Sequence, residues 1–154
     1  MEADLGRRDL FAVFAALAAT TGAVQAQGTA PINTTAELSR SRVIKYSTLK
    51  PIALSNGGAQ RRVMSGTLPT GEFIEVHESM LPAGQMPHPP HKHPNTEMLF
   101  IQEGDLEYID DGKAVPVGPN DIVFSASNIL HGLKNVGTTP ANYIVFSVSK
   151  QLPE

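Results

Sequence analysis

The sequence contains no cysteine, which excludes disulfide bonds, thiolate metal sites, a cysteine nucleophile and a lipidated N-terminal cysteine. It also has no tryptophan, three tyrosines and six phenylalanines, so few rings are available to stack on nucleic-acid bases. The formal net charge is −3 at pH 7, which gives no basic excess for binding phosphates. These absences argue against a nucleic-acid partner, and they leave the hydrophobic core as the source of stability.

Residues 1–26 resemble an export signal. Arg7 and Arg8 precede the apolar run "DLFAVFAALAATTGAVQA", which is too short and too rich in Ala and Thr for a membrane span and ends in a small-residue cleavage pattern. "GRRDLF" resembles a twin-arginine signal, although Gly6 stands where Ser or Thr is commoner. We expect an exported protein, periplasmic or extracellular, with no membrane segment after signal removal. A Sec signal or a retained amphipathic tail is the alternative.

The chain of 154 residues, 41% of them hydrophobic, is long enough for one globular domain. Residues 27–42 are polar and lack periodicity, which indicates a flexible arm or linker. From residue 43 to 154 the chain consists of short β-type runs separated by Gly, Pro, Asn and Asp, with no long helical period and no internal repeat. These features predict an all-β domain, a small sandwich or barrel.

Eight runs are predicted as strands, and "DDG" at residues 110–112 is predicted as a tight hairpin turn. The runs are VIKYS (43–47), RRVMSG (61–66), EFIEVHESM (72–80), EMLFIQ (97–102), DLEYID (105–110), KAVPV (113–117), DIVFS (121–125) and NYIVFSVS (142–149).

The stretch "HPPHKHPNTE" holds three of the five histidines. In a strand, His91 and His93 would point to the same face, because residues two apart do so. Glu97 follows and opens a run whose same-face residues, Leu99 and Ile101, are apolar. An unpaired buried carboxylate is costly, and a divalent cation beside it removes that cost. Two imidazoles and one carboxylate suit Zn, Fe, Mn, Ni, Co or Cu.

His131, in "SNILHGLKN", is the candidate for a fourth ligand. A lone histidine among apolar residues is more often a core or turn histidine than a ligand. The presence of three other candidate ligands reverses that preference.

The chain resembles a single-domain cupin. The first cupin motif reads "GQMPHPPHKHPNTEMLFIQEG" from Gly84 to Gly104, with one departure, six residues in place of five before His91. The second reads "NDIVFSASNILHGLKN", in which Asn120 and Asn128 replace two glycines and Ala126 replaces a proline. Asparagine tolerates a left-handed backbone, so both turns can form.

The resemblance covers about residues 70–149 and implies one double-stranded β-helix, or jelly-roll, barrel. Carried over by position, the metal ligands are His91, His93, Glu97 and His131. The resemblance also implies a small-molecule substrate or ligand, and a homodimer formed through sheet edges.

Four further residues can be weighed from the sequence. His88 is interpreted as a solvent-facing loop histidine, with a role as a proton-moving rim histidine as the alternative. His77 is predicted to lie on a strand surface. Glu78 would lie either in the pocket or at the sheet edge, and it is, with His88, the only acid–base candidate near the site. Asn135 is expected to hydrogen-bond a loop, and the methionines are expected to pack.

Cupins with this ligand set include dioxygenases, oxidases, isomerases, lyases and proteins without known catalysis, so the resemblance does not fix the reaction. We favour a mononuclear metal-dependent enzyme of the dioxygenase or oxidase type that acts on a small oxygenated organic molecule. A non-redox isomerase or lyase and a non-catalytic binding protein are the alternatives. Mn or Fe is the expected ion, with Zn, Ni or Cu as alternatives.

Overall fold

The computed structural model describes residues 38–150. The predicted signal and most of the predicted arm lie outside the described residues. Within 38–150 the chain forms a short 3-10 helix and then a series of strands. These are η1 (Tyr46–Thr48), β1 (Ile52–Ala53), β2 (Ala59–Thr67), β3 (Phe73–Leu81), β4 (Thr96–Glu103), β5 (Leu106–Asp110), β6 (Lys113–Val117), β7 (Ile122–Ser125), β8 (His131–Asn135) and β9 (Ala141–Ser149).

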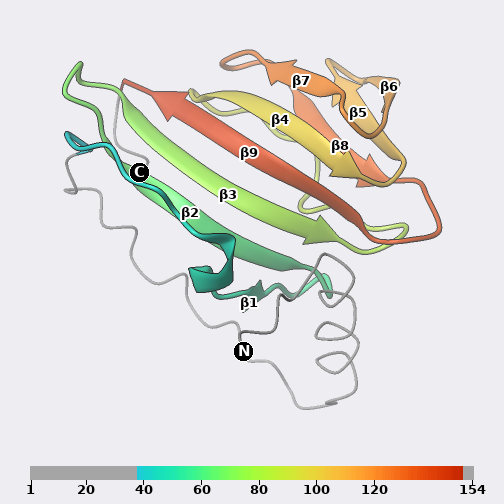
Figure 1. The fold of residues 1–154 in the computed structure, drawn as a ribbon. Coiled ribbons are helices and arrows are strands. Elements are labelled where there is room, and N and C mark those ends of the chain that lie inside the picture. The colour runs from blue at the N-terminus through green and yellow to red at the C-terminus, as the bar shows by residue number, and fades with distance from the viewer. Residues whose placement is uncertain (1–37, 151–154) are drawn as a thin grey trace, which may run out of the picture.

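The strands form two antiparallel sheets that face each other (Figure 1). The larger sheet has the order β1-β2-β3-β9-β4-β7, and the smaller one has the order β6-β5-β8. The last strand, β9, lies between β3 and β4 and pairs with both. Strands far apart in the sequence thus pair within each of the two sheets. This topology confirms the expected all-β jelly-roll barrel.

Seven of the eight predicted strand runs are confirmed, with ends that move by at most two residues. The run at 43–47 is wrong: Val43 is 89% exposed, and η1 begins at Tyr46. Two strands, β1 and β8, are missing from the prediction. β8 includes Gly132 and Lys134 and has no clear alternation, and it is a strand because every residue in it pairs with β5.

The predicted turns have the expected backbone geometry. Asp111 and Gly112 have φ values of 46° and 84° and close the β5–β6 hairpin. Asn120 and Asn128, which replace the motif glycines, have φ values of 74° and 60°. The left-handed conformation is therefore retained at both positions by asparagine.

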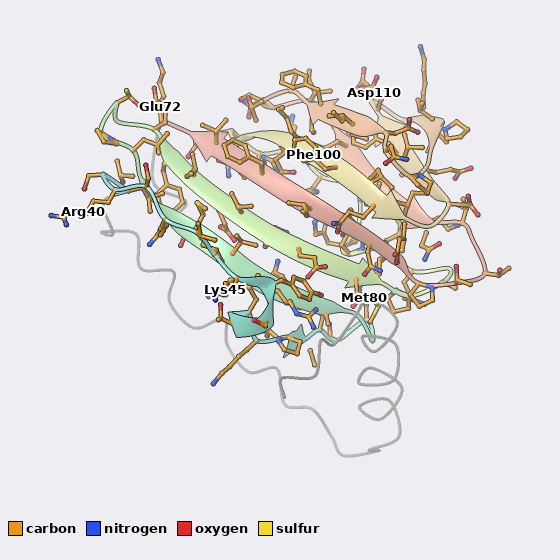
Figure 2. All side chains as sticks on the ribbon, viewed as in Figure 1. Arg40, Lys45, Glu72, Met80, Phe100 and Asp110 are labelled. Carbon is orange, nitrogen blue, oxygen red and sulfur yellow. The ribbon has the colours of Figure 1, made fainter. Side chains whose placement is uncertain are left out.

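The hydrophobic core fills the space between the two sheets. It receives the inward-pointing residues of β4, β5 and β9, and outward-pointing residues such as Phe100 lie on the other face of β4 (Figure 2). No helix within residues 38–150 is long and apolar enough to cross a membrane. The buried core residues are Leu81, Leu99, Ile101, Leu106, Tyr108, Val123, Leu133, Ala141, Tyr143 and Val145.

Asn135 joins the two sequence motifs, as expected of a loop-bonding side chain. It is fully buried, and its amide nitrogen donates to Leu81 O at 2.9 Å and to Thr139 O at 2.8 Å. Its backbone N–H donates to Gln85 O, and its carbonyl accepts from Gly84 N–H. The start of the first motif is thereby held against the end of the second.

Candidate metal centre

Backbone hydrogen bonds bring the histidine-bearing segments together. His91 and His131 form an isolated antiparallel bridge, in which each N–H donates to the other carbonyl, at 2.9 and 2.8 Å. Asn128 N–H donates to His93 O at 2.8 Å. His91 and His93 do not lie in a regular strand, since only the single bridge at His91 forms there. The three imidazole rings nevertheless lie with centroids 4.7–5.0 Å apart.

Backbone carbonyls orient two of these rings. His131 Nδ1 lies 2.9 Å from Ile129 O, and His93 Nδ1 lies 3.2 Å from Asn95 O. A carbonyl oxygen can only accept, so Nδ1 carries the hydrogen in both rings. In the neutral imidazole the lone pair is then on Nε2. Such an outer hydrogen bond is the usual way in which a metal-binding histidine is held in position.

Both Nε2 atoms face the carboxylate of Glu97. Oε1 of Glu97 lies 3.4 Å from His93 Nε2, and Oε2 lies 3.8 Å from His131 Nε2. His131 Nε2 is buried and has no hydrogen-bond partner among the described residues. Neutral imidazole lone pairs and a carboxylate repel one another unless a cation lies between them. The donor set therefore fits a metal ion.

The third imidazole completes the group. One nitrogen from each of His91, His93 and His131 lies within 4.8 Å of the others. Ligands at about 2.0–2.1 Å from one ion lie at most about 4.2 Å apart, so the group is close to a coordination geometry. Burial, and then the neighbouring His88, lower the pKa of His91 to about 4, which keeps the ring neutral. The structure thus brings together all four predicted ligand residues.

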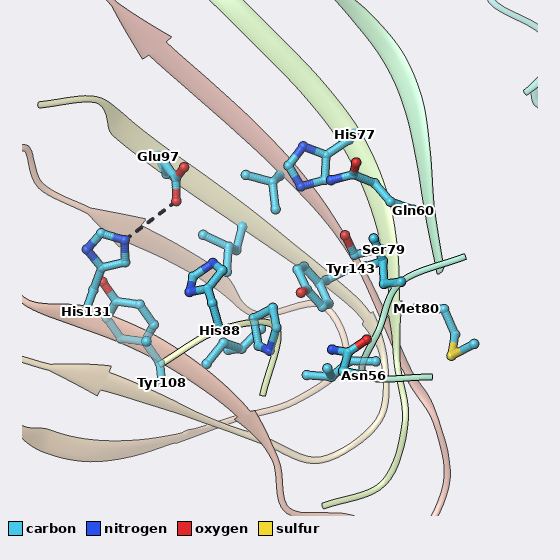
Figure 3. Close-up of a pocket in the computed structure, with 17 residues that line it drawn as sticks. Asn56, Gln60, His77, Ser79, Met80, His88, Glu97, Tyr108, His131 and Tyr143 are labelled. Carbon is cyan, nitrogen blue, oxygen red and sulfur yellow. Dashed lines mark ion pairs between the residues drawn. The ribbon is translucent and has the colours of Figure 1, made fainter. Parts of the chain in front are cut away.

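A cavity of about 330 Å³ adjoins this group, which is the size of a site for a small molecule. Glu97 and His131 lie at one end, and Gln60 and His77 lie at the other (Figure 3). Apolar side chains form much of the wall between the two ends, including Leu81, Leu99, Leu133 and Val145.

The assignments of His77 and Glu78 from the sequence are corrected by the structure. His77 lines the cavity and is largely buried, whereas Glu78 is not among the lining residues. Glu78 instead lies 3.5 Å from Arg61 Nη1 and accepts a hydrogen bond from Tyr46 Oη at 3.4 Å. The error arose because Ile74 and Val76, on the same face as Glu78, are apolar, whereas His77 and Ser79 of the other face line the cavity.

His88 combines the two interpretations given to it. Its side chain is exposed, with Nδ1 3.3 Å from Pro89 O, and it also lines the cavity. Its ring centroid lies 4.2 Å from that of His91. It is therefore a rim histidine next to a candidate ligand, and Figure 3 shows it between the two ends of the cavity.

Three further cavity residues, Gln60, Ser79 and Tyr143, were not identified from the sequence. What identifies these residues is the register in which β2, β3 and β9 pair. Gln60 is opposite Ser79 and Ser79 is opposite Tyr143, so all three share a face with the cavity. This register depends on pairing between distant strands, which no local pattern reveals.

Comparison with known proteins gives a consistent result. Residues 77–147 match the family model described as a cupin domain, and no curated protein matches the chain. A predicted oxalate decarboxylase from Thermotoga maritima is 23% identical, with a TM-score of 0.59, and the match covers 70% of this chain and 98% of that chain. An RmlC-like cupin from Shewanella frigidimarina is 14% identical, with a TM-score of 0.60, and the match covers 71% of this chain and 91% of that chain. The polyketide cyclase RemF from Streptomyces resistomycificus is 15% identical, with a TM-score of 0.59, and the match covers 75% of this chain and 83% of that chain. Residues 77–147 are thus similar to a cupin domain, and the likenesses to solved structures show the fold.

Proposed function

We propose that this cupin domain binds one divalent metal ion through His91, His93, Glu97 and His131, and that it acts on a small oxygenated organic molecule in the adjacent cavity. The observation that carries the proposal is the arrangement of lone pairs. Two imidazole Nε2 atoms, which are acceptors when the rings are neutral with the hydrogen on Nδ1, face one carboxylate at 3.4 and 3.8 Å. A cation is the partner that all of them lack.

A bound divalent ion would supply Lewis-acid polarisation of a substrate oxygen and, with Mn or Fe, redox chemistry. The chain's own residues provide the rest of the site. The bridge between His91 and His131 fixes ligand positions, and the apolar wall at Leu99, Leu133 and Val145 limits the access of water. His88 lies at the rim, where it can exchange a proton with a bound molecule.

We favour an oxidase or dioxygenase reaction. The ligand set contains three imidazoles and one carboxylate without a thiolate, and such a set accepts Mn or Fe as well as Zn, Ni or Cu. The similar solved structures include a predicted decarboxylase and a cyclase, and a shared fold does not fix the chemistry. The proposal therefore depends on which metal is bound.

Elemental analysis of the protein recovered from its natural compartment tests this proposal. We expect about one Mn or Fe per chain. Twin-arginine export carries folded proteins, so an ion can be trapped inside the cell before export. After the domain is unfolded and refolded with Mn, Fe, Cu and Zn all present, we expect Cu or Zn, because these bind nitrogen–oxygen sites more tightly. Zn in the native sample would favour non-redox isomerase, lyase or binding chemistry, and absence of metal would contradict the proposal.

Export itself is a separate proposal, supported by the twin-arginine-like sequence before the apolar run. Intact-mass analysis of the exported form should show that it begins near Gln27. Changing Arg7 and Arg8 together to Lys should block export by the twin-arginine route, because that pair is the recognised element. Unchanged export would indicate a Sec signal, and retention of residues 1–26 would contradict a cleaved signal.

A further inference from the structure

The part of β3 beside the cavity has an inverted polarity pattern. Its inward face carries Glu75, His77 and Ser79, whereas Val76 lies on the outward face. Polar side chains in a barrel interior lower stability unless they find partners. An inward polar stretch that breaks the usual pattern is typical of a functional position.

His77 is held with one nitrogen toward a carboxylate. Nδ1 lies 3.7 Å from Glu75 Oε1, and it is buried with no hydrogen-bond partner among the described residues. Burial and the nearby charge of Arg62 lower the pKa of His77 to about 4, so the ring is neutral. In the neutral tautomer that carries its hydrogen on Nδ1, on the side of Glu75, Nε2 is the acceptor left for a ligand.

Gln60 lines the cavity on the neighbouring strand. It pairs in register with Ser79, and Arg62 pairs with His77, so Gln60 and His77 lie on the same inward face. No hydrogen bond within residues 38–150 engages the Gln60 amide, which can both donate and accept. Gln60 and His77, at the same end of the cavity, together offer it a donor and an acceptor.

This polar pair is separated from the candidate metal ligands. His77 is in register with Val145, and Val145 is in register with Leu99 of β4. Two strand spacings place the Cα atoms of His77 and Leu99 roughly 10 Å apart. Apolar side chains line the space between, so a ligand that reaches both ends needs a polar group at each end and an apolar middle.

We propose that Gln60 and His77 form a second ligand subsite that binds a hydroxyl group, and that the natural ligand is a small hydroxylated molecule whose other end carries the metal-binding oxygens. The inference rests on the proposed function for its metal end. The hydroxyl hydrogen donates to His77 Nε2, and the hydroxyl oxygen accepts from the Gln60 amide. An ether or a hydrogen at that position cannot donate, so the subsite selects for a hydroxyl.

The test uses three pairs of acids of increasing length: benzoate and 4-hydroxybenzoate, phenylacetate and 4-hydroxyphenylacetate, 3-phenylpropionate and 3-(4-hydroxyphenyl)propionate. Each is titrated calorimetrically into Mn-loaded protein, and metal content is measured on the same samples. We expect the hydroxylated member of at least one pair to bind about tenfold more tightly than its partner, which is the size of one or two net hydrogen bonds. The matching methyl ether should lose this advantage.

His77→Phe and Gln60→Leu should each reduce the hydroxyl advantage to less than about twofold, without changing the affinity for the plain acid or the metal content. Glu78→Gln, adjacent to His77 on the outward face, is the matched control and should keep the advantage. A metal-loaded protein without a hydroxyl preference at any length, or with a preference that survives both variants, overturns the subsite alone. A wild-type protein that holds no metal overturns the proposed function, and the two-ended ligand with it.

Discussion

Two carboxylates in this barrel, Glu78 and Glu97, are both largely shielded from water, yet their surroundings differ. Glu78 lies beside the Arg61 guanidinium at 3.5 Å and the Tyr46 hydroxyl at 3.4 Å. The guanidinium of Arg61 also lies over the Tyr46 ring, at 5.0 Å from its centroid. Burial raises the pKa of Glu78, and the Arg61 charge opposes that shift. Glu97 instead faces two imidazole nitrogens that carry lone pairs.

The difference shows that a buried carboxylate does not by itself indicate function. Around Glu78 the chain itself supplies a positive charge, from Arg61, and a hydroxyl donor, from Tyr46, so we interpret this cluster as structural. Around Glu97 the chain supplies two imidazoles rather than a guanidinium, and for the neutral rings a cation is the complementary partner. The chemistry of the partners, rather than the degree of burial, separates a structural cluster from a binding site.

The largest expected effect is loss of metal. His93→Ala or His131→Ala should weaken metal binding more than about a hundredfold, because each removes a ligand, and loss of an outer partner alone costs about 10–100-fold. Glu97→Gln should weaken binding less, since it keeps the shape and one ligand oxygen. Elemental analysis after dialysis measures the effect. Glu78→Gln and His77→Ala should keep the metal, and retention by His131→Ala together with loss by His77→Ala would contradict the ligand assignment.

The next effect is on stability. Glu78→Leu should lower the free energy of unfolding by about 2 kcal/mol, less than the 3–5 kcal/mol of a fully buried pair, because the Arg61–Glu78 contact is long. Metal content should not change. Denaturant unfolding of the metal-free protein measures the loss. A variant as stable as the wild type would show that this cluster contributes little.

A pH effect should distinguish His77 from the metal ligands. Burial, together with the Arg62 charge, lowers the pKa of His77 from 6.5 to about 4. The unfolded state therefore binds more protons between these values, and stability is lost as the pH falls from 6.5 toward 4. When metal-free protein is brought to about pH 5.5, the free energy of unfolding of His77→Gln should fall by about 1 kcal/mol less than that of the wild type. Equal acid sensitivity of both proteins would contradict the assignment of a neutral, buried His77.

The smallest effect is expected at Tyr46. Tyr46→Phe removes the 3.4 Å hydrogen bond to Glu78 but keeps the ring that packs over Arg61. Because this bond is long and the tyrosine is 49% exposed, the loss should be below about 0.5 kcal/mol. Unfolding in denaturant, with Glu78→Leu measured in parallel, checks that Tyr46→Phe causes the smaller loss of stability. A larger loss than for Glu78→Leu would mean that the Tyr46 hydroxyl contributes more to the cluster than the Arg61–Glu78 contact does.

Local patterns predicted most of the strands and the turns. Alternating β-type runs separated by turn residues gave seven strands, and the tolerance of asparagine for a left-handed backbone gave the conformations of Asn120 and Asn128. The segment at 43–47 has a β-type sequence and forms no strand, because it finds no pairing partner. β8 has little β-type pattern and is a strand because β5 pairs with it.

The sequence by itself determined the all-β class and the identity of the four candidate ligands, because spacing and residue type are local properties of the chain. Only the tertiary structure decided which face of β3 points inward, and with it the exchange of roles between His77 and Glu78. Alternation along a strand defines two faces without saying which one meets the opposite sheet. That choice was made by pairing with β2 and β9, which places His77 beside the cavity and Glu78 beneath Tyr46.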